Sequence, residues 1–261
     1  MRIATWNVNS IRSRIDRVEA CLARSDVDVL LMQETKAKDE QFPYDRLRAL
    51  GYEVAHHGTN QWNGVAILSR VGLEDVQVGF DGDPGWGEPP AAEARSIGAT
   101  CAGIRLWSVY VPNGRALDDP HMVYKLDWLA RLREQASAWA ADGTPVALGG
   151  DWNIAPQDED VWSMEYYLDK SHVSPPERAA FNALLEAGFV DVVRPHTPGP
   201  GVYTYWDYQR LAFQKRRGMR IDFVLGSPTF AARVAGAAID REERKGAGAS
   251  DHAPVVVQLE D

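Results

Sequence analysis

Short apolar runs separated by polar turns recur along the whole chain. The runs at 2–8, 27–32 and 146–148 have the length and composition of buried β-strands. Other segments repeat apolar residues every three to four positions, and the longest of these, 122–141, predicts a helix. No low-complexity linker and no repeat of about 20 to 50 residues interrupts this alternation. We therefore expect a single catalytic domain spanning 1–261.

The remaining periodic segments complete an α/β pattern with about ten or more strands. Further strands are expected at 52–57, 65–69, 95–100, 104–111, 220–225, 234–239 and 255–259, and further helices at 15–22, 42–50 and 175–187. The segment 80–90 is acidic and rich in Gly and Pro, which predicts a loop. So many strands interspersed with helices favour two sheets packed face to face, with the helices outside.

The stretch Pro-Val-Ala-Leu-Gly-Gly-Asp-Trp-Asn-Ile-Ala-Pro at 145–156 joins a strand to polar chemistry. We expect Gly149 and Gly150 to let the backbone turn tightly and a bulky ligand approach. Alternation with a period of two places Asp151 and Asn153 on the same side of an extended segment. Active sites of α/β proteins lie at such strand ends. An Asx turn that closes the strand is the alternative explanation.

Other predicted strands also end in polar side chains. These strand-end groups are Asn7, Glu34, Tyr110, Asp222, Asp251 and His252. Each has an ordinary explanation when taken singly: an amide can cap the next helix, an acid can lie at the surface, and a phenol can pack in the core. Their repeated position at the ends of strands favours a common site.

Convergence of Glu34, Asp151 and Asp251 would require a cation. Two carboxylates about 4 Å apart repel by roughly 4 kcal/mol at an effective dielectric constant near 20. Oxygen and amide ligands without cysteine favour Mg²⁺ or Mn²⁺. Asp222 is the natural partner to fix the tautomer of His252, as in a nucleophilic triad, but the serine is missing. Water is then the nucleophile, and a phosphate is the substrate.

Composition and charge limit the classes of partner that the protein can bind. A formal net charge of −9 excludes a protein that coats nucleic acid by overall charge. A basic segment at 210–220 follows the aromatic segment 203–208, and this combination suits contact with bases and phosphates. Two separated cysteines, no leader-like start and no run of membrane-spanning length predict a cytoplasmic protein without a membrane partner, associated with the nucleoid in a bacterium.

The polar motifs together resemble those of the exonuclease III family. The matching motifs are Trp-Asn-Val-Asn at 6–9, Gln-Glu-Thr-Lys at 33–36, Tyr-Val-Pro-Asn-Gly at 110–114, Gly-Asp-Trp-Asn at 150–153, Arg-Ile-Asp at 220–222 and Ser-Asp-His-Ala-Pro at 250–254. They cover the chain in the family's order. The resemblance implies a four-layer α/β/β/α sandwich with two mixed, mostly antiparallel sheets. It also implies Mg²⁺-dependent cleavage of double-stranded DNA on the 5′ side of abasic sites and 3′-to-5′ exonuclease or end-trimming activity, with Mn²⁺ as a substitute ion.

The resemblance also assigns roles to residues of this chain. Glu34 and Asp251 would hold the metal, with Asn7 and Asn9 nearby, and a second ion would involve Asp151, Asn153 and His252. Asp151 would activate water that Asn153 positions. His252, held by Asp222, would bind the scissile phosphate, and Tyr110 would contact that phosphate or assist the leaving oxygen. The residues expected to contact DNA are Arg95, Asn113, Arg115, Tyr205, Trp206, Lys215, Arg216 and Met219.

Two departures from the family pattern leave the balance of activities open. Met219 stands where some relatives carry Trp, and Asn9 stands where others carry Asp. Two alternatives therefore remain: a phosphoesterase of the same superfamily that acts on a lipid or sugar phosphate, and a non-catalytic binder of damaged DNA. The first predicts no basic DNA-facing segment, and the second predicts a lost site residue. We expect a monomer.

Overall fold

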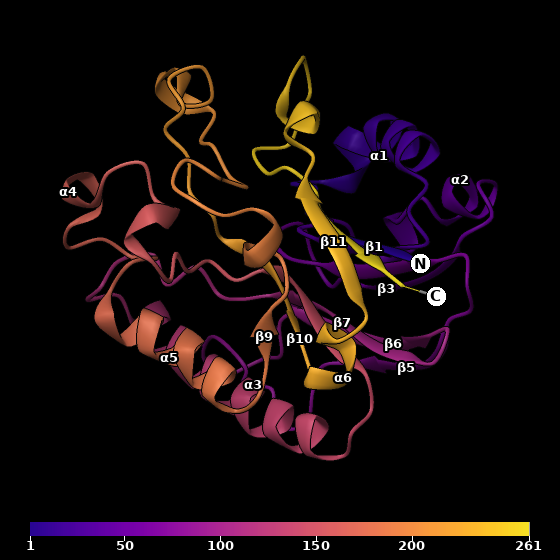
Figure 1. Ribbon diagram of the computed structural model, residues 1–261, viewed down its shortest axis with the longest axis horizontal. Coiled ribbons are helices and arrows are strands. Elements are labelled where there is room, and N and C mark those ends of the chain that lie inside the picture. Colours follow the sequence, from indigo (N-terminus) through magenta and orange to yellow (C-terminus); the bar gives the residue numbers. More distant parts are fainter. Residues whose placement is uncertain (261) are drawn as a thin grey trace.

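Two six-stranded mixed sheets lie face to face in the computed structural model, which describes residues 1–260 (Figure 1). The strands are β1 (Arg2–Asn7), β2 (Val29–Gln33), β3 (Glu53–His57), β4 (Val65–Ser69), β5 (Glu74–Val78), β6 (Ser96–Cys101), β7 (Ile104–Tyr110), β8 (Val146–Asp151), β9 (Val190–Asp191), β10 (Asp222–Gly226), β11 (Val234–Ile239) and β12 (Val255–Leu259). The helices are α1 (Ile11–Ser25), α2 (Tyr44–Arg48), α3 (Pro120–Ala141), α4 (Met164–Tyr167), α5 (Pro175–Glu186) and α6 (Pro228–Ala231). The predicted four-layer sandwich is confirmed.

The strand order brings the polar strand ends to one edge. The sheets have the orders β11-β12-β1-β2-β4-β3 and β5-β6-β7-β8-β10-β9. Strands β1 and β2 are parallel, and so are β7 and β8, so the four carboxyl ends form one rim. Strands β10 and β12 run antiparallel to β8 and β1 and therefore begin at that rim.

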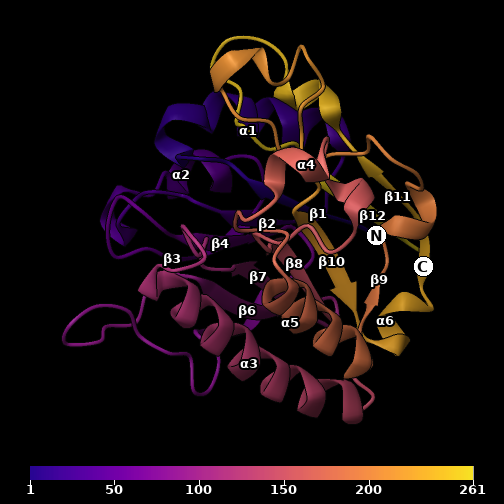
Figure 2. The same cartoon turned by 90° about the vertical axis from the view of Figure 1, so that its left-hand side faces the viewer.

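Three apolar layers hold the sandwich together. The sheets bury Leu31, Leu106 and Val224 between them. Helices α1 and α2 cover the outer face of the first sheet, and α3 and α5 cover the second (Figure 2). Since both sheet faces are covered, β1, β2, β4 and β8 read as nearly continuous apolar runs.

The two glycines of β8 have a different role from the expected one. Gly149 and Gly150 lie within the strand and not in a turn. A Cβ on Gly149 would lie 2.6 Å from Leu31 Cδ1 of the facing sheet, and one on Gly150 would lie 1.8 Å from Val109 O of the neighbouring strand. They therefore permit close packing of backbone and sheets directly below the site. The expectation that they admit a ligand was wrong.

Two local predictions also needed correction. The helix expected at 42–50 is shorter, because Pro43 separates the 3₁₀ turn at 39–41 from α2. Strand β5 was not predicted, because its sequence Glu-Asp-Val-Gln-Val lies largely exposed at a sheet edge and carries little apolar signal.

Within residues 1–260, no helix combines the length and the hydrophobicity that crossing a bilayer requires.

Candidate active site

Four strands deliver side chains to a single cluster at the rim. Asn7 at the end of β1 donates from Nδ2 to Glu34 Oε1 and to Asp151 Oδ2, both at 2.9 Å. Tyr110 at the end of β7 donates its hydroxyl hydrogen to the same Glu34 oxygen at 3.0 Å. The Asn7 amide thus bridges the carboxylates of Glu34 and Asp151, which come from the two different sheets, and the Tyr110 phenol reaches across to Glu34 from the second sheet.

The backbone around Glu34 turns sharply to aim the carboxylate inward. Glu34 has a φ of +49°, a left-handed conformation that is uncommon outside glycine. Its carbonyl oxygen accepts from Ser10 N at 2.7 Å, and Thr35 N donates to Gly64 O at 3.1 Å. Thr35 Oγ1 is also hydrogen-bonded to His56 Nε2 at 2.8 Å. These contacts hold a strained conformation in place.

The predicted pairing of Asp222 with His252 is present. His252 Nδ1 lies 2.8 Å from Asp222 Oδ2, and Thr204 Oγ1 donates to the same oxygen at 2.6 Å. On the other side of the ring, His252 Nε2 lies 3.7 Å from Asp151 Oδ2. All three members of this row, Asp151, His252 and Asp222, are buried.

Burial and charge give these groups different proton affinities. The pKa of Asp151 is raised to about 7. Burial is the largest cause, the charges of Asp222 and Glu34 act in the same direction, and His252 opposes them. Burial disfavours the imidazolium of His252, but Asp222 and Asp151 outweigh that effect and raise its pKa to about 10. Burial and the neighbouring Glu34 raise the pKa of Tyr110 well above 10, so the phenol stays protonated.

Asp251 lies on the same side of the molecule as Glu34. It stands beside the central cluster and is not part of it. Asp251 Oδ1 accepts from Asn9 Nδ2 at 3.0 Å. Asn9 Oδ1 in turn accepts from Lys36 Nζ, which also lies 2.7 Å from Glu34 Oε2. Despite the burial of Glu34, Lys36 and Asn7 keep the pKa of its carboxyl below its usual value. Lys36 therefore partly neutralises the acids.

Two groups among the described residues have a spacing suited to a metal ion. In the first, ligand atoms of Glu34, Asp151 and His252 lie within 4.8 Å of one another. Two carboxylates and one imidazole are ligands that a divalent ion accepts. The tight convergence of the half-buried Glu34 and the buried Asp151 supports a cation there, and this donor set fits one.

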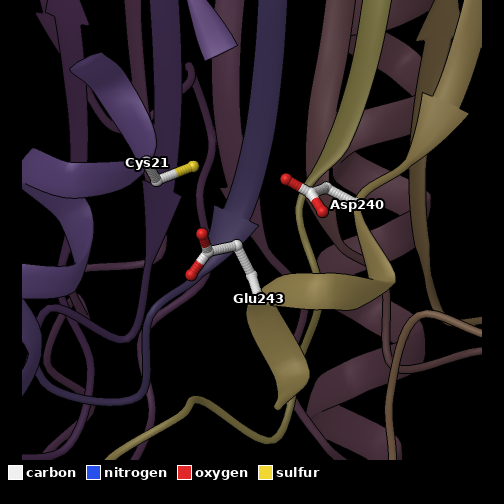
Figure 3. A group of neighbouring side chains, drawn as sticks. All are labelled: Cys21, Asp240 and Glu243. Atoms are coloured by element: carbon white, nitrogen blue, oxygen red, sulfur yellow. The ribbon is translucent and has the colours of Figure 1, made fainter. Parts of the chain in front are cut away.

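The second group consists of Cys21, Asp240 and Glu243 (Figure 3). Arg24 already neutralises its two acids. Arg24 Nη2 lies 2.7 Å from Asp240 Oδ2 and 2.6 Å from Glu243 Oε1. Burial and Glu243 raise the pKa of the Cys21 thiol to about 11, so it is not a thiolate at neutral pH. We assign this group as an ion-pair network. Both cysteines, Cys21 and Cys101, are free and buried, as expected.

A cavity of about 340 Å³ opens beside the row formed by Asp151, His252 and Asp222. It is lined by Tyr205 and Met219, together with Trp162, Tyr167 and His172. The ring of Tyr205 lies 4.9 Å from that of His252. The cavity therefore has aromatic and thioether walls next to the reactive groups, and Tyr205 and Met219, two of the expected DNA contacts, line it.

Two expected DNA contacts are wrong. Arg95 is 5% exposed, because Nε binds Glu93 Oε2 at 2.7 Å and the guanidinium stacks on Tyr110 at 4.9 Å. Trp206 is 2% exposed and packs in a core cluster with Tyr203. Arg220, which the sequence grouped with the basic segment, is also buried.

Four of the other expected DNA contacts lie at the surface. Asn113, Arg115, Lys215 and Arg216 are exposed. Asn113 Nδ2 donates to Asn153 Oδ1 at 3.1 Å, which links it to the site. Lys215 and Arg216 belong to the orange loop beside the yellow 240–250 loop (Figure 1).

Sequence reasoning missed three neighbours of Asn153. His172 places Nε2 3.3 Å from Asn153 Oδ1, and burial lowers the pKa of this imidazole to about 4, assisted by the charge of Lys125. Lys125 and Glu177 form a buried pair directly beneath. The helical positions of the pair suggested surface or capping roles, and only Ser174 with Glu177, at capping-box spacing, gave a local signal.

Comparisons with known proteins agree with this architecture. Residues 4–252 match the model of the Endonuclease/Exonuclease/phosphatase family. The chain is 30% identical over 267 aligned positions to exodeoxyribonuclease III of Haemophilus influenzae, with 98% of each chain covered. It is 31% identical to the DNA repair nuclease APEX1 of Danio rerio, covering 99% of this chain and 82% of that one.

Solved structures show the same likeness. A 3′ phosphatase, NExo, from Neisseria, bound to a product DNA hairpin, superposes with a TM-score of 0.94 at 38% identity, with both chains fully covered. An AP endonuclease from Archaeoglobus fulgidus superposes with a TM-score of 0.93 at 37% identity, again with full coverage. This chain therefore belongs to the endonuclease/exonuclease/phosphatase family, as its motifs predict, and is an enzyme of that family.

Proposed function

We propose that this enzyme is a Mg²⁺-dependent DNA repair nuclease that hydrolyses phosphodiesters 5′ to abasic sites and trims 3′ ends of double-stranded DNA. The observation that carries the proposal is the buried row Asp151–His252–Asp222 beside Glu34, with His252 next to Tyr205 in the wall of an aromatic cavity. Relatives named as exodeoxyribonuclease III, AP endonuclease and 3′ phosphatase support DNA as the substrate.

Glu34 and Asp151 would hold the ion, with Asn7, Asn153 and Asp251 as further or outer ligands. His252 would join them only as a neutral imidazole, so in its protonated state it contacts the phosphate instead. When bound, Mg²⁺, or Mn²⁺ in its place, supplies positive charge to the oxygens of the phosphate that is cleaved. Glu34 retains room for an ion, since its oxygens offer about four lone-pair sites and only three donors contact them.

The protonation states divide the chemical work among the residues. Asp151, with a pKa near neutrality, is suited to accept a proton from the attacking water. His252 stays protonated at neutral pH and presents Nε2–H to the phosphate, while Asp222 fixes the ring. Tyr110 remains a donor that orients Glu34. Asn153, whose main-chain N donates to Asp151 Oδ1 at 2.9 Å, positions the water.

Contact with DNA would use the exposed loops around the cavity. Tyr205 and Met219 offer an apolar wall for a flipped or terminal sugar, and Lys215 and Arg216 lie exposed where they can meet phosphates. We propose that residues 1–261 act as one monomeric catalytic domain in the cytoplasm, near the nucleoid in a bacterium. Phosphoesterase action on a lipid or sugar phosphate would not need this basic loop.

The test uses two duplex oligonucleotides, one with a single abasic analogue and one with a recessed 3′ end. Each is incubated with Mg²⁺, Mn²⁺ or chelator. We expect incision at the analogue and shortening of the 3′ end with either metal, and neither with chelator. Glu34→Gln should weaken Mg²⁺ binding in calorimetry, whereas Glu74→Gln at the exposed edge strand should not. Absence of cleavage on both duplexes would refute the proposal.

A further inference from the structure

A fully buried ion pair lies beneath the site, and the mechanism above does not use it. Lys125 on α3 and Glu177 on α5 are both 0% exposed, and Lys125 Nζ lies 2.5 Å from Glu177 Oε1. Burying two charges is costly, and such pairs often contribute little net stability compared with apolar residues of similar volume. The pair therefore calls for an explanation other than stability.

The ammonium group of Lys125 donates its other two hydrogens to backbone carbonyl oxygens of the site. Lys125 Nζ donates to Asn153 O at 2.6 Å and to Asn113 O at 3.3 Å. An ammonium has three donors, so all of them are used. Two segments far apart in the sequence are thus joined at their main chain.

The carboxylate fixes a third segment. Glu177 Oε1 accepts from His172 N at 3.0 Å, and Oε2 accepts from Ser174 Oγ at 2.5 Å. The pair therefore joins three loops, and each contributes a side chain to the same spot: Asn113 Nδ2 and His172 Nε2 lie 3.1 and 3.3 Å from Asn153 Oδ1.

The backbone it holds is in an unfavourable conformation. Asn153 has a φ of +50° and His172 a φ of +79°, in the left-handed region that is sparsely populated outside glycine, although Asn and His enter it more often than most residues. This geometry also places Asn153 N on Asp151 Oδ1 and Asn153 Nδ2 2.9 Å from Val111 O. Without the buried ammonium, the carbonyl oxygen of Asn153 would lose its charged donor.

We propose that the Lys125–Glu177 pair is a positioning device that holds the strained backbone of Asn153, and so keeps its amide aligned with the base Asp151. This inference rests on the proposed function for its catalytic readout. A merely structural pair would clamp α3 to α5 and leave the rate per folded molecule unchanged. Positioning predicts a loss in turnover, because a displacement of about 1 Å can cost roughly 10²-fold in rate.

The test replaces both charges at once. Lys125→Met with Glu177→Gln leaves no buried charge unpaired, which preserves folding. We expect kcat on the two duplexes to fall about 10²-fold with KM changed less than about threefold, because Asn113 is the one expected DNA contact that Lys125 touches, and Lys215 and Arg216 keep their places. Arg24→Met, which disrupts the ion-pair network with Asp240 and Glu243 at the last turn of α1, is the matched control and should keep kcat. A double variant with normal kcat would overturn the proposal.

A double-mutant cycle separates positioning from other effects. If the pair acts through Asn153, adding it to Asn153→Ala should lower kcat by less than about threefold further, whereas independent effects would multiply. If the two losses in kcat multiplied, the result would contradict a role of the pair in positioning Asn153. If the wild-type enzyme cuts neither duplex, the proposed function fails by itself. The side-chain amide resonance of Asn153 then still tests the pair: it should move in the double variant and not in Arg24→Met, and an unmoved resonance would overturn the inference.

Discussion

Replacing Asp222 with Asn tests the reasoning about the buried row most directly. The pKa of His252 is raised from 6.5 to about 10, with Asp222 as the largest favourable contributor. At about 1.4 kcal/mol for each tenfold change in equilibrium, this corresponds to a net stabilisation of the imidazolium of about 5 kcal/mol. Asp222→Asn keeps the shape but removes the charge, so the imidazolium of His252 loses its largest stabilising partner.

We expect Asp222→Asn to lower kcat by about 10²- to 10⁴-fold, the range found when the orienting carboxylate of a histidine is neutralised. In the metal-free protein, the pKa of His252 followed by NMR should fall by more than one unit. The sign follows from linkage: a raised histidine pKa contributes stability that is complete below about 6.5 and is lost as the pH rises through about 10.

The stability difference between wild type and Asp222→Asn should therefore be largest in mild acid and shrink in alkali. Thr204→Val is the matched control, since it removes the other hydrogen bond to Asp222 without removing the charge. It should cost stability but leave the pKa of His252 raised. An Asn variant with kcat within about fivefold of wild type and an unmoved histidine pKa would refute the reasoning.

Three further predictions concern other parts of the molecule. Asp151→Asn should lose at least about 10²-fold in rate while still binding DNA, and near-normal turnover would show that the base is misassigned. Neutralising Lys215 and Arg216 should reduce the log–log salt slope of DNA binding by about 0.9 for each lost phosphate contact, and an unchanged slope would place the loop away from DNA. Burial raises the pKa of Asp83 to about 6, so its contribution favours folding below about pH 4 and is lost as the pH rises through 6. Asp83→Asn should therefore add about 1 kcal/mol of stability at pH 8, allowing for partial exposure, and none near pH 4, which urea unfolding measures.

The pattern of apolar and polar residues located the strands that carry the site residues. Strand β8 was expected from three apolar residues bounded by proline and glycine, and alternation placed Asp151 at its end. The same logic found Asn7, Glu34 and Tyr110, because a side chain at the end of a buried strand has few alternatives. Edge strand β5 was not found, since exposed strands carry no such pattern.

The amino-acid sequence by itself determined two packed sheets in outline, the strand-end acids and amides, and the pairing of Asp222 with His252. Tertiary structure alone decided which polar residues face inward: Arg95 supports a phenol, Trp206 lies in the core, and Lys125 holds the backbone beneath the site. The physical reason is that alternation reports burial only for apolar residues. A charged or amphipathic side chain is buried when a partner far away in the sequence satisfies it, and no local pattern records that partner.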